Sequence, residues 1–216
     1  GMEPAVKPAV EMNRLTGKRV LVAATPLTLH QSKYTQLVSR VDDHSIVDSL
    51  PLPELVGYCE SLEFDPDRMT RYFLDKFADY RLEEYGTLVL GCTHYPFYTR
   101  ILRQILPPHI EIIDGSAGTV RRLDYILKKT GTSGTQRGGD IRFACSSGDP
   151  EYMAKMHRAY DYYSTQVAGR ERAGGIVGLL RGDPVARIGR IGVAAVAIVG
   201  VLDIGHEVVA GQHTAE

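Results

Sequence analysis

The chain has 216 residues, of which 44% are hydrophobic and 24% are charged, and its formal net charge is −1. This balance is typical of a soluble globular protein and gives no reason to expect a nucleic-acid or membrane-surface partner. The cysteines Cys59, Cys92 and Cys145 form no C-x-x-C pair, which argues against a metal site and against a disulfide framework. No signal-peptide pattern opens the sequence, and the longest apolar stretch, 191–202, is too short to span a bilayer. We therefore expect a cytoplasmic protein without a bound metal.

Short apolar runs alternate with helical patterns through about residue 163. The first half predicts a strand at 19–23, a polar loop at 25–28, a helix at 31–39, a weak strand at 44–47, a helix at 53–60 and a helix from Asp65-Pro66. The second half predicts a strand at 87–90, a helix at 96–106, a strand at 110–113, a helix at 118–129, a flexible loop at 131–139, a strand at 141–144 and a helix from 150 to about 163.

The helix that begins at Asp65 has the clearest start signal. Aspartate is a good N-cap residue, and Pro66 suits the first helical position. Apolar side chains then recur at helical spacing and predict core packing, namely Met69, Tyr72, Phe73, Phe77 and Tyr80. Cys59 lies on the apolar side of the preceding helical segment, so it is also predicted to belong to the core.

The alternation of strands and helices predicts an α/β fold, in which a parallel sheet is flanked by helices. Such sheets bind ligands beyond the carboxyl ends of their strands. Cys92 follows the apolar run 87–90 after a single glycine, Gly91, and is therefore expected at such an end.

Cys92 lies in the stretch LVLGCTHYPF, residues 88–97, between a predicted strand and a predicted helix. A free cysteine is often only a small buried hydrophobic residue. Here a helix start near Pro96 would stabilise a thiolate, His94 could exchange a proton, and Thr93 offers a hydroxyl and an N–H group to a carboxylate. Cys145, which precedes Ser146-Ser147-Gly148-Asp149, has weaker support as a site residue.

The hexapeptide Gly91-Cys92-Thr93-His94-Tyr95-Pro96 resembles the second cysteine motif of bacterial glutamate racemases, and related amino-acid racemases share it. Further segments also resemble that family: Glu3-Pro4 with Lys7-Pro8-Ala9, Ala24-Thr25-Pro26-Leu27-Thr28, 49–61, Ile113-Asp114-Gly115 and Ser147-Gly148-Asp149. The resemblance covers roughly residues 1–165, which makes it more specific than the hexapeptide alone.

The resemblance implies a cofactor-independent racemisation in which two cysteines flank the α-carbon of glutamate. One thiolate removes the α-proton, and the other thiol returns a proton from the opposite face. By this resemblance Cys92 is one base, His94 assists proton transfer, and Glu60 is the acid that partners His94. The implied substrate contacts are Thr93, His94, Thr25 and Thr28. The implied product, D-glutamate, supplies peptidoglycan synthesis in the cytoplasm.

The sequence departs from the family in one respect, because it contains no Asp-Ser-Gly and no Cys-Asn-Thr motif. These motifs belong to the first of two pseudo-symmetric halves, so we expect 1–112 to be the second domain and 113–165 to be a returning segment of an incomplete first domain. The tail 166–216 is unlike the family and is expected to lack regular structure.

Two alternatives to an active glutamate racemase remain open, and the first follows from this departure. One is a catalytically incompetent fragment without the first cysteine, and the other, within the enzyme class, is an aspartate racemase. Apolar faces left uncovered from 113 onward predict aggregation, partial disorder or a homodimer.

Overall fold

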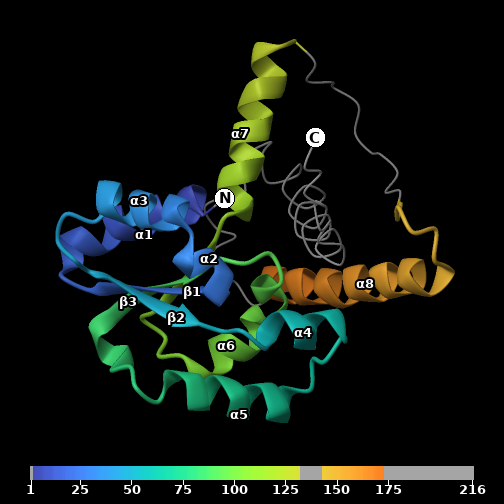
Figure 1. The fold of residues 1–216 in the computed structure, drawn as a ribbon, viewed down its shortest axis with the longest axis horizontal. Helices are drawn as coiled ribbons and strands as arrows, with labels where there is room; N and C mark the ends of the chain where they lie inside the picture. The colour runs from blue at the N-terminus through green and yellow to red at the C-terminus, as the bar shows by residue number, and fades with distance from the viewer. Residues whose placement is uncertain (1, 132–142, 173–216) are drawn as a thin grey trace, which may run out of the picture.

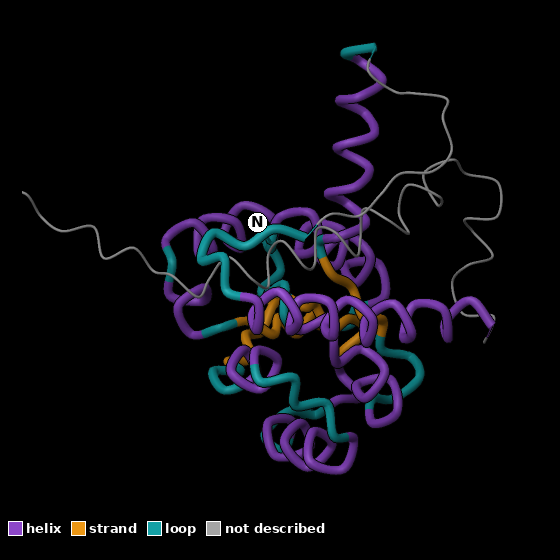
Figure 2. Tube along the Cα trace, turned by 90° about the vertical axis from the view of Figure 1, so that its right-hand side faces the viewer, coloured by secondary structure: helices purple, strands orange, loops and turns teal. Residues whose placement is uncertain are grey.

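The computed structural model describes residues 2–131 and 143–172. Within these residues a four-stranded sheet has the order β2–β1–β3–β4, and every neighbouring pair of strands is parallel. The strands are β1 (Arg19–Ala24), β2 (Val47–Pro51), β3 (Tyr85–Leu90) and β4 (Glu111–Asp114). The predicted α/β fold is confirmed, with helices on both faces of the sheet (Figures 1 and 2).

Helices connect the parallel strands, and after β2 the chain adds its next strands on the other side of β1. The helices are α1 (Glu3–Thr16), α2 (Pro26–His30), α3 (Ser32–Val41), α4 (Leu55–Glu60), α5 (Pro66–Phe77), η1 (Leu82–Glu84), η2 (Tyr95–Tyr98), α6 (Thr99–Ile105), α7 (Ser116–Lys129) and α8 (Pro150–Arg172). The chain passes from β1 outward to β2 and then crosses back over β1 to β3. The switch point of the sheet therefore lies between β1 and β3, where ligands of open α/β sheets bind.

Two hydrophobic cores pack against opposite faces of the sheet because successive side chains of a strand point to opposite sides. Val20 and Val22 of β1 belong to the core under α1 and α3, whereas Leu21 and Ala23 belong to the core that α4, α5 and α6 cover. The second core is rich in aromatic side chains, and Phe73 of the predicted apolar stripe is fully buried there.

Helix α8 packs on the aromatic core, whereas α7 projects away from the sheet (Figure 1). The rings of Tyr163 and Phe97 lie 5.2 Å apart, and the Gln166 side-chain amide donates a 2.7 Å hydrogen bond to the Phe97 carbonyl oxygen. The Tyr162 ring stacks on Phe64 at 3.9 Å. The last described helix is therefore an integral layer of the fold.

Several predicted elements are displaced. The prediction of a weak strand at 44–47 is wrong, because the strand begins only at Val47. The Asp42 carboxylate accepts hydrogen bonds from the N–H groups of Ile46 and Val47 just before and at this start. The helix at 96–106 is divided into η2 and α6. The predicted loop at 25–28 contains the start of α2. The predicted strand at 141–144 lies partly outside the described residues, and Phe143 and Ala144 belong to no strand.

The predicted loop at 131–139, apart from Gly131, and residues 173–216 of the predicted tail at 166–216 also lie outside the described residues. The expectation that the tail lacks regular structure is wrong for 166–172, which form the end of α8. Helix α8 extends well beyond its predicted end near 163. The other predicted strands and helices are present with shifts of a few residues at their ends.

Candidate functional site

The candidate site begins where β1 and β3 end side by side. Ala23 pairs with Leu90 in the parallel register, and the Gly91 N–H donates a 2.7 Å hydrogen bond to the Ala23 carbonyl oxygen. Thr25 and Cys92 each follow two residues after this last pair, so both lie at the carboxyl ends of neighbouring strands. The structure thus brings two of the predicted site segments to the switch point of the sheet.

Gly91 allows this close approach because it has no side chain. A Cβ atom there would overlap the terminal methyl of Met2, and it would lie 3.0 Å from the Ala23 carbonyl oxygen and 3.2 Å from the Ala24 Cβ. The glycine between β3 and Cys92 is therefore favoured by close packing against β1, which gives its place in the hexapeptide a structural reason.

Thr25 and Thr28 form a compact hydroxyl pair at the end of β1. Thr25 is the N-cap of α2, and its hydroxyl accepts the Thr28 N–H at 3.2 Å. The two hydroxyl oxygens lie 2.9 Å apart, and both side chains are partly exposed. The pair can therefore offer hydrogen bonds to a ligand from a fixed turn.

Cys92, His94 and Glu60 form a continuous hydrogen-bonded array. The Cys92 Sγ lies 3.5 Å from His94 Nδ1, and His94 Nε2 lies 2.9 Å from Glu60 Oε1. The His94 side chain is fully buried, whereas Cys92 is partly exposed. Because both ring nitrogens have partners, the orientation of the imidazole is fixed. The predicted contact between His94 and Glu60 is present, while the neighbouring Thr93 is exposed.

The electrostatics of the array favour a charged imidazole. Burial by itself lowers the pKa of His94, but its hydrogen bonds to Cys92 and Glu60, together with their charges, raise that pKa to about 9. Burial by itself raises the pKa of Glu60, but the bonds from His94 and Lys155 bring it below its ordinary value. At neutral pH, the array therefore holds a charged imidazolium with a carboxylate behind it.

Lys155 is a member of the array that sequence reasoning missed. Its Nζ lies 3.3 Å from Glu60 Oε2, although the two residues are 95 positions apart in the sequence. No local spacing could reveal this contact, because α8 reaches Glu60 only through the tertiary fold.

The other two cysteines have different surroundings. Cys59 is 1% exposed in the aromatic core, where burial raises the pKa of its thiol well above the ordinary value. This confirms its predicted place in the core. Cys145 is partly exposed, and its Sγ lies 3.0 Å from the Ser147 hydroxyl.

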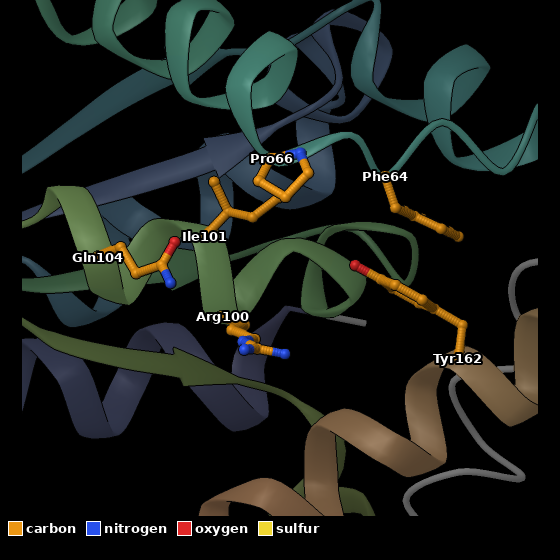
Figure 3. Close-up of a pocket in the computed structure, with 6 residues that line it drawn as sticks. All are labelled: Phe64, Pro66, Arg100, Ile101, Gln104 and Tyr162. Atoms are coloured by element: carbon orange, nitrogen blue, oxygen red, sulfur yellow. The ribbon is translucent and has the colours of Figure 1, made fainter.

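A separate cavity of about 200 Å³ lies where α5, α6 and α8 meet (Figure 3). It is lined by Phe64, Pro66, Arg100, Ile101, Gln104 and Tyr162. Figure 3 shows the Tyr162 ring reaching from α8 toward α6. None of its lining residues belongs to the array of Cys92, His94 and Glu60.

Across 2–131 and 143–172, no three His, Cys, Asp or Glu side chains come together in a group able to hold a metal ion. In the same ranges, no helix is both long enough and apolar enough to cross a membrane.

The chain is similar to curated glutamate racemases. The chain is 49% identical to the glutamate racemase of Halothermothrix orenii over 158 residues, which cover 73% of this chain and 62% of that protein. It is 38% identical to glutamate racemase 2 of Bacillus subtilis over 164 residues, which cover 74% of this chain and 62% of that protein. No protein-family model matches the chain.

Among solved structures, the chain is similar to Escherichia coli glutamate racemase in complex with L-glutamate and the activator UDP-MurNAc-ala. The TM-score is 0.56 at 26% identity, and the match covers 73% of this chain and 59% of that chain. The glutamate racemase of Campylobacter jejuni, at 21% identity and a TM-score of 0.53, shows the same fold. The chain spans only 62% of the length of the two curated relatives, and over that matched part it belongs to the glutamate racemase family.

Proposed function

We propose that this chain provides one wall of an amino-acid racemase site, which interconverts L- and D-glutamate with Cys92 as one of two bases. The observation that carries the proposal is the array of Cys92, His94 and Glu60 at the switch point of the sheet. The family of the matched part supports glutamate as the substrate.

In the proposed reaction the Cys92 thiolate removes the α-proton of the bound amino acid. An α-proton is a weak acid, so the base must be held close to it and the developing charge must be stabilised. The buried imidazolium of His94 stabilises the thiolate, and Glu60 keeps the ring oriented. Thr93, Thr25 and Thr28 are proposed to bind the substrate through hydroxyl or backbone N–H groups.

Inversion also needs a proton from the opposite face of the α-carbon. The 216 residues contain no Cys-Asn-Thr motif, and the buried Cys59 is unsuited to the task because its pKa is raised. Cys92 is therefore the one base that we assign within this chain. A racemase-like half-site without net inversion is accordingly the second candidate function.

The test measures inversion and proton exchange separately. Circular dichroism follows the loss of ellipticity as L- or D-glutamate is racemised. NMR in D₂O follows the exchange of the α-proton for deuterium. Racemisation in both directions supports the full reaction, whereas exchange with retention of configuration supports the half-site. Both activities should disappear in Cys92→Ala and persist in the control Cys145→Ala. An unaffected Cys92→Ala variant, or the absence of both activities, would refute the assignment of Cys92 as base.

The remaining assignments are proposals of the same kind. Residues 1–112 are proposed as one domain and 113–165 as a segment of a second one. The assay with L- and D-aspartate beside glutamate decides between the two substrates. A cytoplasmic location, a homodimer and a supply of D-glutamate to peptidoglycan synthesis complete the proposal.

A further inference from the structure

The two carboxylate oxygens of Glu60 have different partners. Oε1 lies 2.9 Å from His94 Nε2, and Oε2 lies 3.3 Å from Lys155 Nζ. The side chains of Glu60 and Lys155 are 28% and 24% exposed, so water screens their attraction less than it screens a surface pair. The carboxylate is thus held on one side by the imidazole and on the other by an ammonium group.

Helix α8 holds Lys155 in this place. The Nζ lies 4.6 Å from the centre of the Tyr152 ring, which belongs to the same helix. This cation–π contact limits the conformations of the flexible lysine side chain. The helix is fixed further along by Gln166, which bonds to the Phe97 carbonyl oxygen, and by Tyr163 in the aromatic core. The ammonium group is therefore presented to Glu60 by a packed helix.

The groups that face the array come from three elements. Glu60 belongs to α4, Cys92 and His94 belong to the turn before η2, and Lys155 comes from α8. Cys59 is also close, but its thiol stays neutral because burial raises its pKa. Lys155 is therefore the one cation, apart from His94 itself, that bonds to Glu60 among the described residues.

We propose that Lys155 is a positioning residue, which holds Glu60 in the rotamer that orients His94 toward Cys92. A carboxylate held at only one oxygen can rotate away from the imidazole, whereas one held at both oxygens is fixed. Lys155 acts through Glu60 and touches neither Cys92 nor the substrate. Its role in catalysis rests on the proposed function, but its effect on the array can be measured without turnover.

The sign of the effect separates positioning from simple charge repulsion. Removing the ammonium charge by Lys155→Met would slightly raise the pKa of His94 if the charge acted only through space. If Lys155 positions Glu60, the same variant weakens the bond between His94 and Glu60, and the pKa of His94 falls. We expect a downward shift on the order of one pH unit.

The experiment combines an NMR titration of His94 with the pH dependence of Cys92 alkylation by iodoacetamide, followed by peptide mass spectrometry. Lys155→Met should shift both curves, and Lys155→Arg should restore them. Lys76→Met is the matched control, because Lys76 lies 3.3 Å from Glu54 and 5.4 Å from the Tyr72 ring in an equivalent pair. It should leave both curves unchanged.

A double-variant cycle protects the test against a general loss of structure. In a Glu60→Gln background, Lys155→Met should cause no further shift in either curve. An upward or absent shift of the His94 titration in Lys155→Met, or a failure of Lys155→Arg to restore the curves, overturns the positioning role. If the titration shifts while every variant lacks racemisation and exchange, the proposed function fails and the positioning role stands.

Discussion

The N–H of Gly91 donates a 2.7 Å hydrogen bond to the carbonyl oxygen of Ala23, so β1 and β3 remain joined up to the residues that precede the candidate site. This bond sets how closely Cys92 lies to the turn that begins at Thr25. Gly91 permits this close packing, because an added Cβ would lie 3.0 Å from the Ala23 carbonyl oxygen.

Gly91→Ala should destabilise the fold by about 1–3 kcal/mol, because the added methyl would meet the Ala23 carbonyl and the Met2 side chain. Urea unfolding measures the change. Gly57→Ala is the control, since a Cβ there meets nothing within 4 Å and a helical glycine is replaced, so stability should rise by about 0.5–1 kcal/mol. Adding Met2→Ala should recover part of the loss at Gly91. Equal stability of Gly91→Ala and the parent chain would contradict the packing argument.

Stability should fall as the pH rises from neutral to alkaline values because of His94. The folded-state pKa of His94 is raised to about 9 from an unfolded value of about 6.5, so folding binds a proton between these values. The stabilisation is complete below about pH 6.5 and is lost as the pH passes through 9; its upper limit is roughly 3 kcal/mol. Urea unfolding from pH 6 to 9.5 should show this slope.

The slope should be much smaller in the His94→Gln variant. It should be unchanged in His44→Gln, which replaces an exposed histidine. The same slope in all three proteins would assign the pH dependence to other groups. On the acid side, the folded-state pKa of Glu60 lies below the unfolded value of about 4.3. Glu60 therefore stabilises the fold at pH values above about 4.3, and this stabilisation is lost as the pH falls through the folded-state pKa.

The opposite end of the sheet depends on an ionic contact across three strands. Arg19 of β1 donates to both oxygens of Asp48 of β2 at 2.6 and 2.7 Å, and the Tyr85 hydroxyl of β3 donates to the same carboxylate at 2.8 Å. Asp48→Asn should cost about 1–2 kcal/mol in chemical unfolding, because it removes a bidentate charged bond.

The exposed pair of Arg14 and Asp43 provides the comparison. Asp43→Asn should change stability by less than about 0.5 kcal/mol, since the Asp43 side chain is 65% exposed, whereas that of Asp48 is 31% exposed. If Asp43→Asn and Asp48→Asn cost the same, the location of Asp48 between the strands would have no special importance.

Helix α7 exposes an apolar strip that should cause self-association. Leu123, Tyr125 and Ile126 are 42%, 53% and 41% exposed on a helix that projects from the sheet. Light scattering coupled to size-exclusion chromatography should show a mass that rises with concentration. The double variant Leu123→Ser with Ile126→Ser should reduce this association, whereas Lys129→Ser on the same helix should not. A constant monomer mass at all concentrations would refute the prediction.

The strands of the sheet centre could be predicted because they are apolar on both faces. Leu88 and Val89 are buried on opposite sides, so a continuous apolar run indicated the buried strand before Cys92. The edge strand β2 was predicted at the wrong residues because only Leu50 is buried in it. Its charged Asp48 binds Arg19 of β1, a contact between distant residues that a local sequence pattern does not indicate.

The local part of the site could also be predicted, since Cys92 and His94 are two residues apart. The Asp65 cap is likewise a local signal, and its side chain accepts the Arg68 N–H as expected. Glu60 was found through its resemblance to a family segment. Lys155 had neither kind of signal, because its distance from Glu60 is bridged only by the packing of α8 on the aromatic core.

The separation between Glu60 and Lys155 has a consequence during synthesis of the chain. The two residues lie 95 positions apart, so at about 5–20 residues per second the lysine leaves the ribosome roughly 5–20 seconds after the glutamate. In the later part of that interval, after His94 has followed Glu60 by 34 positions, Cys92, His94 and Glu60 are all present in the nascent chain, but Lys155 and its helix are not. The contact between Lys155 and Glu60 therefore forms only after α8 has been synthesised, late in translation of the described residues.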